Sequence, residues 1–591
     1  MKPVVPRMPF FGRDAKGMPR EVGLLVPPEI LFPGTEASEG ALIDVLSGLS
    51  RDDTLFFCGR TNILVSGPGD FDVKGRQQKA LYALCTPNEI DRINAFARAH
   101  PGSGAPTVFF RGQMLELTRW AARHCRNLPG DGTTFLDAQT RSRFVKAALI
   151  AGMLWSKRVY SDRLSGGGEI EAVRRRALGP FRKSIEEGNL APHLGVTLGR
   201  GWSLFNDYFP RWYPDFTAEF QRTTGLTLEQ YLTCTTGLAT YTIFNKADGP
   251  LFVTQTVAGA TAYRDILPGY LALEAQTPAR LATALWDDFE RIGYRPLRER
   301  PIMVTEDGRG IILDPTFYLE RISIGPLFHV LARAEGGKAN EIFGAFGLAF
   351  ESYATDILRR MYPSRPGLVD RLACNVLGKD ALGRGFEIDA ALHDVKDAII
   401  FEKKAAWVRE DAILYEDKFL NEIRSKYGAL PGSGEREKGV AQLARSIGAI
   451  ARCEWLGPKD EFRDARVLYP VLVVHDVRMG APILGNFLAE EFERLLGALP
   501  AGARRVAPLT VMTIDDLENM ESSVAQFSMR ELLADYAREC PDRLRSLHNF
   551  IAFSDYGPKI LPSGDLVRSS TELIERVQKQ FFPPKAEASV S

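Results

Sequence analysis

The sequence predicts a multidomain α/β protein: an N-terminal α/β part, a mainly helical middle part and a C-terminal mixed sheet flanked by helices. Its 591 residues are about four domain lengths, so several hydrophobic cores are expected. Hydrophobic residues make up 45% and charged residues 25% of the chain, which is typical of a folded soluble protein. The spacing of apolar residues also changes near residues 130 and 336, which indicates the boundaries between the parts.

The overall charge and the cysteines exclude several classes of protein. Lys plus Arg (74) equals Asp plus Glu (74), so a nucleic-acid site would have to be a local basic patch. The seven cysteines form no C-x-x-C pair, which argues against both a zinc cage and a disulfide framework. Prolines and charges interrupt the N-terminus, and no apolar run approaches the ~18 residues that span a bilayer. We therefore expect a cytoplasmic protein with no membrane partner.

The first two parts differ in their apolar spacing. Residues 1–130 contain short apolar runs, such as Thr54–Cys58 and Thr107–Phe110, between Gly/Pro-rich segments. This pattern predicts strands within an α/β or α+β region. Residues 131–335 contain longer segments with helical spacing, such as Leu271–Arg291, and are predicted to be mainly helical.

A basic cluster lies within the predicted helical part. Residues 141–183 contain eleven basic and three acidic residues, a local net charge of +8, and include Lys157, Arg158 and Arg174, Arg175 and Arg176. Such clusters bind phosphate backbones through counterion release, which favours a DNA-binding surface. The alternative interpretation is two helices with solvated arginine faces.

The C-terminal part, residues 336–580, has a different order of elements. Its helix ends before Pro363 and carries Glu351, and a polar turn at Asp394–Asp397 joins its first two strands. The predicted order is helix, strand, strand, helix and strand, over Phe343–Met361, Gly385–His393, Ile399–Trp407, Lys438–Arg452 and Val467–His475. Residues 581–591 form a polar tail that is expected to be disordered.

The two-stranded hairpin carries the residues that suggest chemistry. Asp389 lies on the first strand, and Glu402 and Lys404 lie on the second. Because side chains alternate along a strand, Glu402 and Lys404 share one face while Lys403 points to the other. An antiparallel hairpin sets Asp389 across from that pair. Converging carboxylates favour a hard divalent cation, Mg²⁺ or Mn²⁺, and a neighbouring lysine completes a minimal set for phosphodiester hydrolysis.

The sequence context distinguishes this motif from chance matches. An acid two residues before a lysine occurs five times in the chain. Only Glu402–Lys404 lies in a β-type apolar run, IIFEKKAAW, with an Asp-bearing strand before it. A solvated strand face or a cross-strand ion pair is the alternative interpretation.

These residues resemble the PD-(D/E)XK nuclease superfamily, also called the restriction-endonuclease-like fold, over residues 340–515. The core of that family is a helix with an acid, a strand with Asp, a strand with (D/E)-x-K, a helix and a further strand. Here Ile388 stands where the family name has proline. The matching elements are those of Glu351, Asp389, Glu402–Lys404, Gln442 and Val467–His475.

The resemblance implies a role for each residue of the motif. Asp389 and Glu402 would bind Mg²⁺ or Mn²⁺ with help from the backbone carbonyl of Lys403. Lys404 would orient the attacking water and offset charge on the phosphate.

Two further residues join the motif on the same resemblance. Glu351 would act on the metal through water, or on a second metal. Gln442 would join from the following helix, as in some branches of the family. Glu387, two residues before Asp389, is a rival metal ligand.

The resulting functional hypothesis is a cytoplasmic, Mg²⁺-dependent deoxyribonuclease, which by analogy suggests restriction or antiphage defence. The N-terminal 330 residues would recognise substrate, a protein partner or a signal, and a homo-oligomer is left open. One alternative is a catalytically silent nuclease fold that serves as a nucleic-acid-binding or scaffold subunit. Another is a helical interaction protein in which the motif is accidental.

Overall fold

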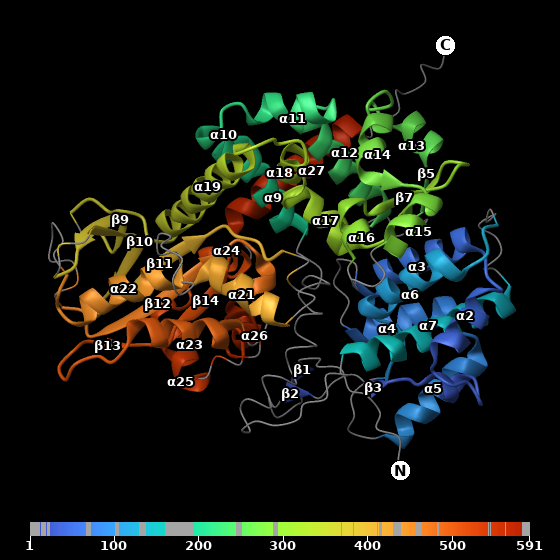
Figure 1. Ribbon diagram of the computed structural model, residues 1–591, viewed down its shortest axis with the longest axis horizontal. Coiled ribbons are helices and arrows are strands. Elements are labelled where there is room, and N and C mark those ends of the chain that lie inside the picture. Colours follow the sequence, from blue (N-terminus) through green and yellow to red (C-terminus); the bar gives the residue numbers. More distant parts are fainter. Residues whose placement is uncertain are drawn as a thin grey trace.

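The structure is a computed structural model, and its parts lie in a row. Figure 1 shows the N-terminal helices at one end and the large sheet at the other. No helix among the described residues is long and apolar enough to cross a bilayer. The structure describes residues 12–13, 19–20, 24–66, 73–100, 106–128, 137–159, 194–243, 251–287, 294–428 and 439–581, with short gaps inside the last two ranges. The predicted C-terminal tail lies almost entirely outside these residues.

The described N-terminal part is almost entirely helical, which corrects the predicted α/β character. The run Thr54–Cys58 lies inside a helix, because a short apolar run has the same composition in a buried helix as in a buried strand. Among the described residues between 24 and 128, the only strands are the two-residue β3 (Leu24–Leu25) and β4 (Pro106–Thr107). The described helices are α1 (Pro28–Leu31), α2 (Glu39–Leu46), α3 (Arg51–Ser66), α4 (Val73–Leu84), α5 (Pro87–Ala99) and α6 (Arg111–His124). Helix α7 (Ala138–Val159), which the sequence assigned to the middle part, packs in the same core as these helices.

The middle part is mainly helical and also contains a small mixed sheet that the sequence pattern did not predict. Its strands are short, and their order is β5-β8-β7-β6. They are β5 (Leu251–Val253), β6 (Ala275–Gln276), β7 (Ile302–Val304) and β8 (Arg309–Ile312). The helices used below are α9 (Leu194–Ser203), α10 (Phe209–Trp212), α12 (Leu228–Thr242), α14 (Leu267–Glu274), α17 (Pro315–Ser323) and α18 (Gly325–Leu331).

The C-terminal part is built on a six-stranded mixed sheet. The strand order is β13-β12-β11-β10-β9, with β14 also paired to β12. Strands β9, β10 and β11 form an antiparallel meander, and β12 lies parallel to β11. The strands are β9 (Leu372–Lys379), β10 (Gly385–Asp394), β11 (Asp397–Lys404), β12 (Val467–Val474), β13 (Arg505–Val506) and β14 (Thr510–Thr513).

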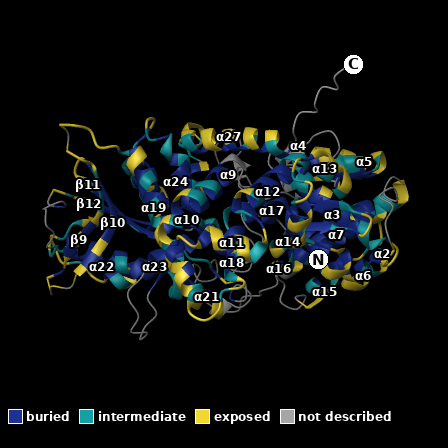
Figure 2. Ribbon diagram, turned by 90° about the horizontal axis from the view of Figure 1, so that it is seen from above, coloured by how far each residue is buried: buried dark blue, intermediate teal, exposed yellow. Residues whose placement is uncertain are grey.

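Helices cover both faces of this sheet. Helix α19 (Lys338–Met361) packs on one face, where Phe401 joins the same core as Phe350. Helices α22 (Val440–Ala451) and α23 (Leu484–Leu496) pack on the other, in the core that contains Ile400. Figure 1 shows the central strands between these helices. Figure 2 shows that these strands are largely buried. The alternation of buried side chains on β11 thus lets one strand contribute to two cores.

Buried charge pairs join the three parts. Between the N-terminal and middle parts, Arg111 Nε donates a 2.7 Å hydrogen bond to Asp314 Oδ2. Between the middle and C-terminal parts, Arg200 of α9 donates to Glu518 of α24 (Ile514–Glu521) at 2.8 Å. Tyr353 of α19 donates to the same Glu518 carboxylate at 2.7 Å. Since a buried charge is costly without its partner, these pairs define how the parts fit together.

Candidate active site

The predicted residues Asp389 and Glu402 are brought together by the hairpin register. The pairing of β10 with β11 ends at Ala390 and Phe401, and Asp389 and Glu402 are the next residues of the two strands. Asp389 Oδ2 accepts a 2.7 Å hydrogen bond from the backbone N–H of Lys403. The backbone of one strand therefore holds the carboxylate of its neighbour in place.

Side chains of β11 point alternately to the two faces of the sheet, as the sequence predicts. Lys404 Nζ lies 3.1 Å from Glu402 Oε1, so these two side chains share one face. Lys403 points to the opposite face, where its ammonium donates to the hydroxyl of Thr355. Lys403 is 1% exposed and Lys404 has a 23% exposed side chain, so only Lys404 can meet a substrate.

Helix α19 supplies a third carboxyl group. Its apolar side chains pack on the sheet, and Glu351 is half-buried at the boundary of that contact. Burial raises the pKa of Glu351 to about 7, and the negative charge of Asp389 adds to this rise. The positive charges of Lys404 and Lys403 act in the opposite direction. Glu351 therefore shares an electrostatic field with the hairpin residues, although it lies far from them in the sequence.

The same field acts on Glu402 and Lys404. Burial, followed by the charge of Asp389, raises the pKa of Glu402 to about 8, although Lys404 opposes this. Burial by itself would lower the Lys404 pKa, but Glu402, Glu351 and Asp389 raise it overall. The three carboxyl groups thus repel one another when ionised, and a bound cation would relieve that repulsion.

One oxygen of Glu402 lacks a hydrogen bond. Glu402 is 2% exposed, and its Oε1 accepts no hydrogen bond although the Lys404 ammonium lies near it. The described residues contain no group of three or more His, Cys, Asp or Glu arranged to hold a metal ion. The groups that could bind a cation here are two carboxylates and a backbone carbonyl, which are the oxygen ligands that Mg²⁺ and Mn²⁺ prefer.

The two weaker candidates are placed differently. Gln442 Nε2 donates a 3.4 Å hydrogen bond to the backbone oxygen of Glu387, so it contacts β10 rather than the carboxylates. Glu387 is exposed, and its charge affects Glu351 less than that of Asp389 does. Asp389 therefore remains the stronger ligand candidate.

The basic cluster is described only in part. Arg174, Arg175 and Arg176 lie outside the described residues, as does the side chain of Arg158. Lys157 is exposed near the end of α7, and its ammonium donates to the backbone oxygen of Ala37 at 2.8 Å. The nucleic-acid-binding role of this cluster stays a prediction.

His475 was not singled out in the sequence, although it follows the apolar strand β12 directly. Its backbone N–H donates to the Lys404 oxygen at 3.1 Å, next to the candidate site. Its ring is buried between Phe346, Phe350 and Trp407, and neither ring nitrogen has a hydrogen-bond partner among the described residues. Burial lowers the pKa of His475 to about 3, so the ring packs as a neutral group.

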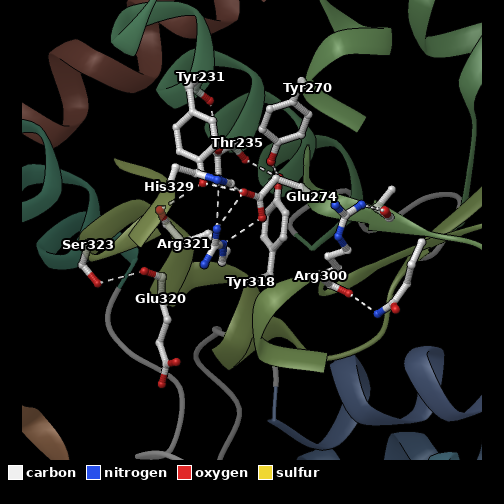
Figure 3. A network of polar contacts seen from close by, with 12 residues as sticks. Tyr231, Thr235, Tyr270, Glu274, Arg300, Tyr318, Glu320, Arg321, Ser323 and His329 are labelled. Atoms are coloured by element: carbon white, nitrogen blue, oxygen red, sulfur yellow. Dashed lines mark hydrogen bonds and ion pairs between the residues drawn. The ribbon is translucent and has the colours of Figure 1, made fainter. Parts of the chain in front are cut away.

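A second polar cluster, the Glu274 network, lies in the middle part. Figure 3 shows Arg321 and His329 converging on the carboxylate of Glu274. Arg321 donates to both of its oxygens, at 2.8 and 3.0 Å, and the His329 ring lies 2.7 Å away. Tyr231 also donates to it at 2.8 Å. Because the Glu274 oxygens are both paired and the group is fully buried, the network packs α12, α14, α17 and α18 together.

Comparison with known proteins gives no family for this chain. No family model matches it, and no curated protein or solved structure is significantly similar to it.

Proposed function

We propose that the C-terminal part is a metal-dependent nuclease of the PD-(D/E)XK type, with DNA as the preferred substrate. The proposal rests chiefly on one observation: the Asp389 carboxylate is bound by the backbone of the strand on which Lys404 lies 3.1 Å from Glu402. Glu351 of a third element adds to the charge around this group. The order of α19, β9 to β11, α22 and β12 is compatible with the fold that the motif implies.

Asp389 and Glu402 would hold the Mg²⁺ or Mn²⁺ ion, together with the backbone carbonyl of Lys403. When bound, the ion would polarise the phosphate and lower the pKa of a water molecule. The Asp389 carboxylate is already oriented by the Lys403 N–H at 2.7 Å. The Glu402 carboxyl would release its proton on binding, since its pKa is about 8 in the absence of a cation.

The remaining groups would serve the hydrolysis itself. The water oxygen forms a bond to phosphorus, one bridging P–O bond breaks, and a proton from the water ends on the leaving oxygen. Lys404 would offset negative charge on the pentavalent phosphate. Glu351, with a pKa of about 7, is suited to take up and return that proton near neutral pH.

A cleavage assay with Mg²⁺ and Mn²⁺ on plasmid, linear duplex and single-stranded DNA tests the proposal. Asp389→Asn removes a metal ligand with little change in shape, so cleavage should fall by ~10²-fold or more. Isothermal titration with Mn²⁺ should show the same loss of binding.

Lys396→Ala is the matched control, since Lys396 is exposed in the turn at the far end of the same hairpin and should leave cleavage unchanged. A wild-type chain that binds DNA but neither cleaves it nor binds Mn²⁺ would favour the silent nuclease fold. A chain that neither binds DNA nor cleaves it would favour the accidental motif.

A further inference from the structure

Three aromatic side chains form a partly exposed surface, here called the aromatic ledge: Phe328, Phe343 and Trp407. Phe328 is 37% and Phe343 39% exposed, which is unusual for large apolar rings. Trp407 lies between them, with ring centroids 6.0 Å from each. Trp407 also packs on the buried rings of Phe346 and His475, with centroids 5.1 Å from each. The ledge is therefore held by buried rings beneath it.

Two independent paths place the ledge beside the candidate site. Trp407 follows Lys404 by three residues, a span of at most about 10 Å. Phe343 and Glu351 lie on α19, eight residues or about 12 Å apart along the helix. A stacked strand advances ~3.4 Å per nucleotide, so the ledge lies within a few nucleotides of a phosphate held at Lys404.

The helix surface between the ledge and Glu351 is open. Phe343, Gly347 and Glu351 follow one another at intervals of four residues and so share one face of α19. A Cβ atom added at Gly344 or Gly347 would meet nothing within 4 Å. Packing inside the chain therefore does not require glycine at either position. The surface at these two glycines is therefore not covered by other side chains of the described chain.

We propose that the ledge stacks the unpaired bases of a single strand, so that the nuclease acts on single-stranded or locally unpaired nucleic acid. This inference rests on the proposed function. Aromatic rings stack on any base, because every base has a π-face, whereas the bases of an intact duplex are already stacked on each other. A duplex would have to open before its bases could reach rings on this surface.

The charges near the ledge fit a strand of phosphates. Along the chain, Lys404 precedes Trp407 by three residues, and Arg409, with a 65% exposed side chain, follows it by two. Glu422, 3.3 Å from Arg409, offsets part of that charge. Grooves that bind single strands combine basic residues with aromatic stacking rings, and this segment carries both.

The test replaces rings by an aliphatic side chain of similar volume. Phe328→Leu with Phe343→Leu keeps an apolar surface but removes the π-faces, and Tyr82→Leu, at a 67% exposed tyrosine on α4, is the control. Binding is measured in metal-free buffer by fluorescence anisotropy of a labelled oligothymidylate of about 12 nucleotides and of a duplex of equal length. The double variant should bind the single strand about ten-fold more weakly per ring and the duplex unchanged. The control should match the wild type.

The outcomes separate this inference from the proposed function. Equal single-strand binding by the wild type and the double variant overturns the inference, even if the enzyme cleaves. Equal loss of single-strand and duplex binding also overturns it, because stacking on unpaired bases would then not be the cause. Ring-dependent single-strand binding without Mg²⁺- or Mn²⁺-dependent cleavage supports the ledge and contradicts the nuclease. Unaltered binding accompanied by loss of self-association in the leucine variant would identify the ledge as a protein contact instead.

Discussion

The Glu274 network and the candidate active site use the same residue types with opposite results. Burial by itself would raise the pKa of Glu274, but Arg321 and His329 outweigh it and lower that pKa to about 2. Burial and Asp389 raise the pKa of Glu402 to about 8, although Lys404 lies 3.1 Å away. Both carboxylates are almost fully buried. Burial alone therefore does not distinguish them.

The difference lies in the number of donors and the number of neighbouring acids. Glu274 receives hydrogen bonds from Arg321 and Tyr231, which compensate its charge within the fold. Glu402 has a single ion-pair partner, the Lys404 ammonium at 3.1 Å, and that ammonium also interacts with Asp389 and Glu351. A carboxylate whose charge is balanced by donors and cations is typical of a structural ion pair. A carboxylate with too few such partners is typical of a ligand-binding site.

The largest expected effect is a loss of stability when the Glu274 network is changed. Arg321→Met should lower the free energy of unfolding by ~3–5 kcal/mol, because it leaves the Glu274 carboxylate buried without its main partner. Urea denaturation followed by fluorescence measures this change. The double variant Arg321→Met, Glu274→Leu should recover part of the loss. A single variant as stable as the wild type would mean that this network does not hold the middle part together.

Lys404→Met should impair cleavage strongly and change stability little, the reverse of what is expected for Arg321→Met. Cleavage should fall by ~10²–10³-fold, since a charge that faces the phosphate is removed. The urea midpoint should change little, because Lys404 lowers the Glu402 pKa and its loss leaves that carboxyl protonated and uncharged at neutral pH. Measuring cleavage and denaturation on the same preparation checks both expectations. Strong destabilisation of this variant would mean that Lys404 stabilises the fold, as Arg321 does.

The pH dependence should also separate the two regions. A divalent cation must displace the proton of Glu402, so Mn²⁺ affinity should rise about ten-fold per pH unit between pH 6 and 8. Calorimetry in buffers of different ionisation enthalpy measures the proton released. Glu274, with a pKa of about 2, does not titrate in this window.

Glu402→Gln is the control for that measurement, and it also reports on stability. The Glu402 pKa rises from 4.5 to about 8 on folding, so the folded protein binds this proton more tightly than the unfolded chain does. Stability from this group is present below pH 4.5 and is lost as the pH rises through 8. The variant should bind Mn²⁺ weakly at every pH and lose less stability over that range. An equal loss in both proteins would show that Glu402 titrates normally.

The smallest effect comes from the same substitution made in each region. Gly347→Ala, on the open face of α19, should stabilise the protein by about 0.5–1 kcal/mol, because alanine favours the helix and its Cβ meets nothing. Gly325→Ala should destabilise it, because the added Cβ would lie 2.6 Å from the Tyr231 hydroxyl in the Glu274 network. Thermal denaturation checks the signs. If both variants changed the melting temperature in the same direction, the surface of α19 at Gly347 would not differ in packing from the Glu274 network at Gly325.

The sequence by itself determined the local framework of the candidate site. The hairpin and the placement of Glu402 and Lys404 on one strand face follow from side-chain alternation, which depends only on neighbouring residues. The helix of Glu351 follows from apolar spacing and the proline after its end in the same way.

The tertiary structure determined which distant residues meet and which side chains are buried. It brought Glu351 to the hairpin, buried Glu402 enough to raise its pKa, and joined Glu274 to Arg321 across 47 residues. It also made Thr54–Cys58 helical, since the same apolar run can fill a helix or a strand until its neighbours are known. Pairing between distant segments has no signal in local periodicity, because it depends on which surfaces exclude water together.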